Sequence, residues 1–104
     1  MDLNYFKKTR ILDAGMGQEL LARGLITKGT LWSATSLIDE KFNSLVIDTH
    51  LSSIKAGAEV ILTNTFTTRR VRMVQNQVGE LFEFANQKAC ELATKQKNYQ
   101  KKIF

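Results

Sequence analysis

The pattern of apolar and polar positions predicts two strand–helix units in succession. Residues 10–13 form a short apolar run that ends at an acidic residue, and residues 18–23 predict a short helix after a glycine turn. Between Asp39 and Gly57, apolar side chains recur at the spacing of a helix that lies on a sheet. Residues 59–64 contain consecutive apolar positions, which are typical of a parallel strand buried on both faces.

The second half of the chain predicts one further long helix. Residues 67–77 are basic and predict a loop or a frayed helix, whereas residues 78–97 carry apolar side chains at helical spacing. Cys90 lies beside this apolar stripe and is expected to be a half-buried structural thiol. Residues 101–104 resemble the start of a third strand. The fold class predicted from this order is α/β.

Composition restricts the class of protein. The chain has 104 residues, 43% of them hydrophobic, and no apolar run approaches the ~20 residues of a membrane span. Neither a signal peptide nor a second cysteine is present, which leads us to expect a reducing, cytoplasmic setting. The net charge is +5, and the excess lies in residues 53–104. Because no aromatic residues interleave with the basic clusters, a solvated face is favoured over nucleic-acid binding.

Polar residues follow both predicted strands. Asp13 ends the first strand beside Gly15 and Gly17, and Asn64 and Thr65 end the second. Because parallel strands present their carboxyl ends at the same edge of a sheet, these residues are predicted to converge on one small polar ligand. For Asp13 alone, a plain strand-to-helix connection remains an equally good interpretation, since short glycine motifs are weak signals.

Two aromatic residues between these strands have more than one interpretation. Trp32 would either anchor the packing over the mouth of the site or form a wall of the pocket. His50 falls near the apolar stripe of its helix, and a structural hydrogen-bonding role is favoured over metal binding because no second ligand residue lies four positions away.

Several of these motifs occur in an order that resembles the N-terminal part of the homocysteine S-methyltransferase family. The motifs are Leu12-Asp13-Ala14-Gly15-Met16-Gly17, Leu31-Trp32-Ser33-Ala34, His50, Ala56-Gly57-Ala58 and Thr63-Asn64-Thr65-Phe66. The resemblance runs from about Arg10 to the end of the chain. It implies the homocysteine-binding (β/α)8 TIM barrel of that family. Such a barrel needs about 250 residues, so residues 1–104 are expected to be an incomplete, N-terminal βαβα portion of the domain.

The resemblance also implies an activity and a substrate site. Members of the family transfer a methyl group from a small donor to the thiol of homocysteine, giving methionine, and hold the thiol on a zinc ion bound by three cysteines. Those cysteines would lie on later strands, so zinc is expected for the full-length family but its ligands are absent from this chain. Asp13 matches the acidic residue that holds the substrate ammonium group. The other residues matched to the substrate-binding side are Ala14, Gly15, Met16, Gly17, Trp32, Asn64 and Thr65, although Ala14 stands where many members have glycine.

Two classes of function follow. The first is a portion of a homocysteine S-methyltransferase, inactive on its own, which binds homocysteine as part of the full-length enzyme. The second is a non-catalytic module that uses the basic second half on an anionic partner. A phosphate-binding α/β unit is a marginal third interpretation, because the spacing of a phosphate-binding loop is lacking. We expect the isolated chain to self-associate, since its parallel strands would leave unpaired edges.

Overall fold

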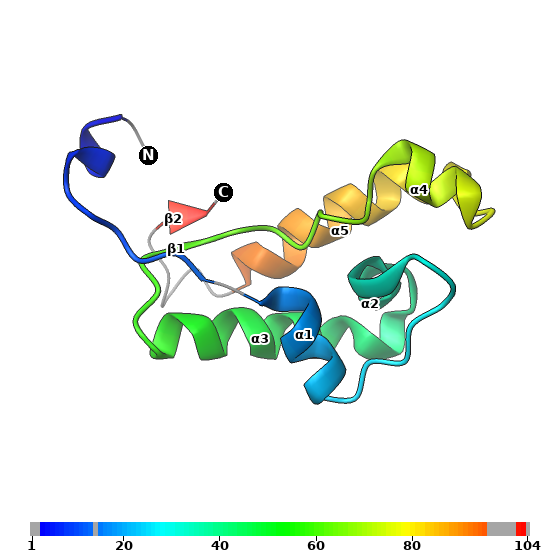
Figure 1. The fold of residues 1–104 in the computed structure, drawn as a ribbon, viewed down its shortest axis with the longest axis horizontal. Helices are drawn as coiled ribbons and strands as arrows, with labels where there is room; N and C mark the ends of the chain where they lie inside the picture. The colour runs from blue at the N-terminus through cyan, green and yellow to red at the C-terminus, as the bar shows by residue number, and fades with distance from the viewer. Residues whose placement is uncertain (1–2, 14, 96–101, 104) are drawn as a thin grey trace.

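Helices make up most of the structure. The computed structural model describes residues 3–13, 15–95 and 102–103. In chain order the helices are α1 (Met16–Ala22), α2 (Thr35–Ile38), α3 (Asn43–Lys55), α4 (Arg70–Gln75) and α5 (Phe82–Thr94) (Figure 1). The 3₁₀ turn η1 (Leu3–Lys7) precedes α1, and η2 (Trp32–Ala34), η3 (Glu40–Phe42) and η4 (Gly79–Leu81) lie between the helices. The described part is therefore an α/β structure dominated by its helices. None of its helices is long and apolar enough to cross a membrane.

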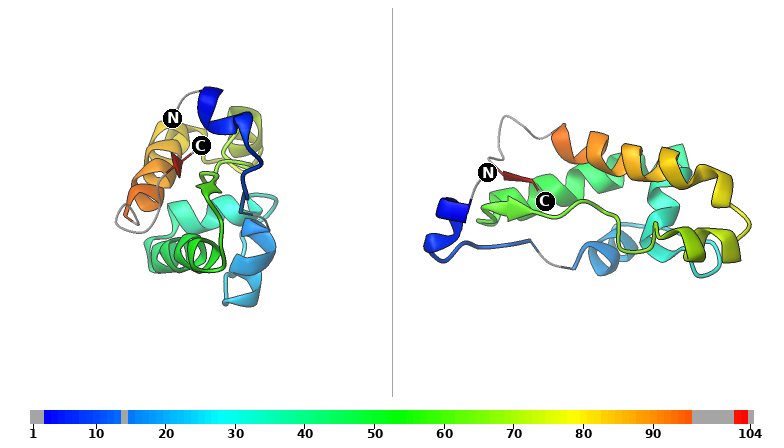
Figure 2. Two further views of the ribbon diagram at one scale, coloured as in Figure 1. Left: turned by 90° about the vertical axis from the view of Figure 1, so that its left-hand side faces the viewer. Right: turned by 90° about the horizontal axis from the view of Figure 1, so that it is seen from above.

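Three short extended segments lie parallel to one another. Strand β1 (Val60–Ile61) pairs with β2 (Lys102–Ile103), and on its other side Leu12 forms a parallel bridge with Val60. The predicted start of a third strand is thus confirmed at residues 102–103. The figures show η1 and β2 at the same end of the molecule (Figures 1 and 2).

The strands are shorter than predicted. Only Leu12 of residues 10–13 and residues 60–61 of 59–64 are in strand pairing. The ladder ends at Ile61 because the next backbone N–H, that of Leu62, donates to the side chain of Asp13 at 3.2 Å from each carboxylate oxygen. Val60 and Ile61 are fully buried, as expected, but Leu62 is 45% exposed.

The core lies between the helices. Helices α3 and α5 run side by side, and α1 and α2 pack against α3 (Figures 1 and 2). The fully buried side chains include Leu20, Leu37, Val46, Met73, Ala85 and Ala89. At the strand side, Arg10 joins Glu59 through an ion pair of 2.9 Å, with its guanidinium over the ring of Tyr5. The apolar stripe predicted for the last helix is confirmed, since Ala85, Ala89 and Leu92 are all buried.

Several local predictions need correction. The helix predicted over residues 18–23 begins earlier, at Met16, and ends at Ala22. On this short helix Leu20 is buried and Leu21 is exposed, because adjacent residues point in directions about 100° apart and only one side of α1 faces the core. Cys90 is exposed rather than half-buried. The predicted helix over 78–97 is divided into η4 and α5, and its residues after position 95 lie outside the described part. The segment 67–77 contains the helix α4.

Candidate functional site

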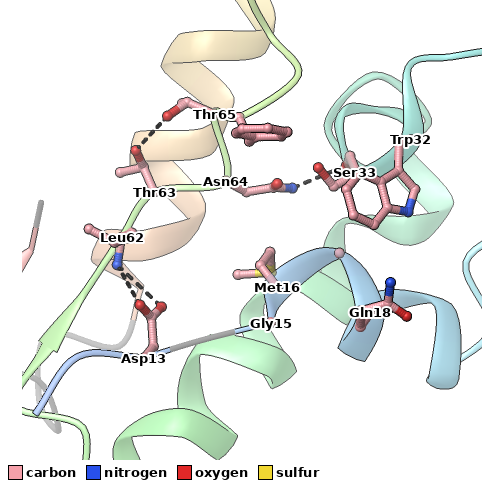
Figure 3. A pocket seen from close by; sticks show the side chains of 12 residues that line it. Asp13, Gly15, Met16, Gln18, Trp32, Ser33, Leu62, Thr63, Asn64 and Thr65 are labelled. Carbon is pink, nitrogen blue, oxygen red and sulfur yellow. Dashed lines mark hydrogen bonds between the residues drawn. The ribbon is translucent and has the colours of Figure 1, made fainter.

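A pocket opens where the parallel segments end and α1 begins. Its volume is about 260 Å³. The residues around it come from three separate stretches of the chain and are Asp13, Gly15, Met16, Gly17, Gln18, Trp32, Ser33, Leu62, Thr63, Asn64, Thr65 and Phe66 (Figure 3). The pocket therefore lies at the carboxyl ends of the Leu12 segment and of β1, where ligands bind in α/β proteins.

The predicted site residues converge here. Asp13, Gly15, Met16, Gly17, Trp32, Asn64 and Thr65 all line this pocket, and Ala14 lies outside the described residues. Sequence reasoning missed Gln18, Ser33, Leu62, Thr63 and Phe66. Each of these residues except Leu62 directly adjoins a predicted site residue, and Leu62 is two positions before Asn64, so proximity in the sequence was the available signal.

Asp13 links the two strand ends. Its carboxylate accepts the Leu62 N–H (Figure 3). Its own backbone N–H donates to the carbonyl oxygen of Val60 at 3.1 Å. Burial raises the pKa of the Asp13 carboxyl above its ordinary value, and hydrogen bonds from the backbone N–H groups of Leu62 and Asp13 partly oppose this rise. The side chain is thus a half-buried carboxylate at the pocket wall, with the chemistry to accept a hydrogen bond from a cation.

Glycine is favoured at two positions after Asp13, one immediately before α1 and one in its first turn. Gly15 precedes α1 with φ of 67°, in the left-handed region that glycine adopts without steric cost. Gly17 lies against the indole of Trp32, because a Cβ atom built on Gly17 would stand 2.7 Å from Cζ2 of that ring. Trp32 therefore both packs against α1 and lines the pocket, so its two interpretations are combined in one position.

Buried polar side chains beside the pocket are hydrogen-bonded to one another or to the backbone. Asn64 is 3% exposed, and its Nδ2 donates to the carbonyl oxygen of Ser33 at 3.1 Å and to Oγ of Ser36 at 3.0 Å. The backbone N–H of Ala34 donates to Oγ1 of Thr67 at 3.0 Å. We refer to Ser33, Ser36, Asn64 and Thr67 as the polar cluster. Of these residues only Asn64 was a candidate from the sequence.

His50 lies elsewhere and differs from its expected role. It is on α3, fully buried, and neither ring nitrogen has a hydrogen-bond partner among the described residues. The expected hydrogen-bonding role is therefore wrong for the described part of the chain. Burial lowers the pKa of His50 to about 4, because the charged form loses its hydration.

Within residues 3–13, 15–95 and 102–103, no group of three or more His, Cys, Asp or Glu side chains is placed to hold a metal ion. The arginines after the pocket contact the chain itself. Arg69 lies over the ring of Phe66, Arg70 over the ring of Phe82, and Arg72 donates to the carbonyl oxygen of Thr30 at 3.2 Å.

Comparison with known proteins identifies the family of this chain. The family model for homocysteine S-methyltransferase matches residues 10–104, and the chain belongs to that family. The protein Homocysteine S-methyltransferase 2 of Saccharomyces cerevisiae is 32% identical over 89 residues, which cover 77% of this chain. The chain spans 27% of the length of that relative. No solved structure matches the chain.

Proposed function

We propose that this chain forms the substrate amino-acid side of a homocysteine S-methyltransferase. The observation that carries the proposal is the position of the Asp13 carboxylate in a pocket at the carboxyl ends of parallel strand segments. Homocysteine has an ammonium group, a carboxylate and a thiol. A carboxylate held in place by a backbone N–H is suited to the ammonium group, because charge-assisted hydrogen bonds are stronger than neutral ones.

The reaction proposed for the whole enzyme is a transfer of one methyl group. The thiolate sulfur of homocysteine forms a bond to the methyl carbon, and the bond between that carbon and its donor breaks, giving methionine. Zinc is the cofactor expected from the family, and the described residues of this chain do not supply a ligand set for it. The contribution that we propose for this chain is to bind and orient the amino-acid part of the substrate.

We further propose that the parallel segments begin a (β/α)8 barrel. Their order in space, Leu12, β1 and then β2, follows their order in the chain. Apolar residues in and next to the segments remain exposed, with Ile11 at 57%, Leu12 at 50% and Leu62 at 45%. Further strands of a barrel would cover this surface. In the isolated chain the same surface would favour self-association.

The test is binding of homocysteine to the chain and to an Asp13→Asn variant, measured by isothermal titration calorimetry. We expect the variant to bind at least about tenfold more weakly, because a hydrogen bond between two charged groups is lost. Asp48→Asn, at an exposed acid on α3, is the matched control and should bind as the wild type does. Stability should be equal or higher in Asp13→Asn, since burial disfavours the charged form of this carboxyl.

The same measurement includes a ligand control. The wild-type chain should bind homocysteine more tightly than 4-mercaptobutyrate, which has the same thiol and carboxylate but no ammonium group. Equal affinity for the two compounds, or an Asp13→Asn variant that binds homocysteine as tightly as the wild type, would contradict the proposed role of Asp13.

A further inference from the structure

Trp32, whose indole forms one wall of the pocket, has a strained backbone conformation. Trp32 has a φ of 48°, in the left-handed region that bulky residues rarely adopt. Such strain persists only where the surrounding structure holds it, and it is concentrated at functional sites. The turn that begins with Trp32 is η2, which includes Ser33, and the other members of the polar cluster are hydrogen-bonded to residues of this turn.

The hydrogen bonds reach this turn from the end of β1. Asn64 donates to the Ser33 carbonyl, and Oγ1 of Thr67 accepts from the Ala34 N–H. The same Thr67 oxygen lies 3.3 Å from Oγ of Ser33. Ser36 also donates to the Ser33 carbonyl, at 2.6 Å. Ser33, which immediately follows Trp32, is therefore hydrogen-bonded both to nearby Ser36 and to the distant Asn64, and Ala34 is hydrogen-bonded to Thr67.

The amide nitrogen of Asn64 is fully used in these contacts. An Asn side chain has two N–H donors, and the two acceptors of Asn64 are the Ser33 carbonyl and the Ser36 hydroxyl. In Figure 3 its side chain points toward Ser33. Because Asn64 as a whole is 3% exposed and both of its N–H donors are used, it is better placed to hold the Trp32 turn than to donate to a ligand.

We propose that Asn64 and Thr67 are positioning residues, which hold Trp32 in its left-handed conformation so that the indole forms the pocket wall over Gly17. The inference rests on the proposed function only for the identity of the ligand, homocysteine. The position of the indole can be measured without any ligand, because Trp32 is the single tryptophan of the chain.

The experiment compares Trp32 fluorescence, excited selectively, in matched pairs of ligand-free variants. Asn64→Ala removes the amide, and Asn86→Ala is its control, since Asn86 also donates two hydrogen bonds, to the carbonyls of Thr68 and Phe82. Thr67→Val removes the hydroxyl, and Thr49→Val is its control, a buried threonine that donates to the Leu45 carbonyl on α3. Circular dichroism identifies the variants that fold.

We expect Asn64→Ala and Thr67→Val to shift the emission of Trp32 to longer wavelength and to increase its quenching by acrylamide. Thr67→Ser, which keeps the hydroxyl, should restore the wild-type spectrum. The two controls should leave the emission and quenching of their folded states unchanged even where they lower stability. Unchanged emission in folded Asn64→Ala and Thr67→Val, or equal changes in the controls, would overturn the proposal.

A measurement on the wild-type chain gives an answer even if these variants do not fold. In ¹⁵N NMR spectra, the side-chain N–H₂ protons of Asn64 should exchange slowly with solvent, and their resonances should shift little when homocysteine is added. Fast exchange would contradict the positioning role, and a large shift on adding homocysteine would assign Asn64 to the ligand instead.

Homocysteine binding then separates this proposal from the proposed function. Thr67→Val should weaken binding about tenfold, since the wall is no longer held in place, and Thr67→Ser should restore the affinity. If wild-type chain fails to bind homocysteine, the proposed function fails, while the fluorescence and exchange results still decide whether Asn64 and Thr67 position the indole.

Discussion

Two buried polar regions of this protein differ in how their polar atoms are satisfied. In the polar cluster beside the pocket, Ser33, Ser36, Asn64 and Thr67 are hydrogen-bonded to one another or to the backbone. On α3, His50 is equally buried, and its ring nitrogens have no partner among the described residues. The first region joins a strand end to a turn, whereas the second lies inside the helical layer.

The difference shows what buried polar groups can contribute to this fold. A hydrogen-bonded group has directional contacts and can therefore hold a turn in a strained conformation. A buried imidazole without partners has no such directional role, and burial keeps it neutral. We expect the polar cluster to determine the shape of the pocket, and His50 to affect mainly how stability depends on pH.

The largest expected effect comes from acidification. His50 is neutral in both states above its ordinary pKa of 6.5, but between 6.5 and about 4 only the unfolded chain takes up the proton. The free energy of unfolding should therefore fall as the pH decreases through this window, by about 3 kcal/mol in total, because one pKa unit corresponds to about 1.4 kcal/mol. Urea unfolding at a series of pH values measures it.

A His50→Leu variant provides the comparison for this prediction. This variant should lose the pH dependence due to His50 and keep that of the carboxylates. The raised pKa of Asp13 has the opposite effect to the lowered pKa of His50, because it favours the folded state as the pH decreases. The role assigned to His50 would be wrong if the wild type and His50→Leu lost stability in parallel across the window.

A smaller effect is expected where the pocket wall meets α1. Gly17→Ala would place a Cβ atom 2.7 Å from the Trp32 indole, so the ring must shift. We expect a loss of about 2 kcal/mol, as for other overpacked positions, with a change in Trp32 emission. In a Trp32→Ala background the same substitution should cost nothing, because alanine is the better helix former. An equal loss in both backgrounds would show that the indole is not the obstacle.

The smallest effect is expected for a single hydroxyl of the polar cluster. Ser36→Ala removes the donor to the Ser33 carbonyl and an acceptor of Asn64, and should lower the free energy of unfolding by about 1 kcal/mol. Ser44→Ala, at an exposed position of α3, should change it by less than about 0.5 kcal/mol. Thermal unfolding followed by circular dichroism compares the two. Equal losses would mean that the Ser36 hydrogen bonds contribute no more than a surface hydroxyl does.

Much of the order of elements was predictable from local patterns. Helical spacing located α3 and α5, and the consecutive apolar residues around Val60 and Ile61 located β1. The candidate residues Asp13, Gly17, Trp32 and Asn64 were found from strand ends, glycines and family motifs, and they line the pocket. Strand lengths were overestimated. The backbone N–H of Leu62, which would have continued the ladder, donates instead to the side chain of Asp13.

The sequence by itself located α3, α5 and β1 and identified the family, since periodicity, glycine positions and motif order are local or sequential properties. Only the tertiary structure decided which polar groups find partners. Asn64 meets Ser33 and Ser36 across about thirty residues, while His50, on a regular helix, has no partner among the described residues. Hydrogen bonding depends on the distance and direction between atoms brought together by packing, and no local pattern encodes either.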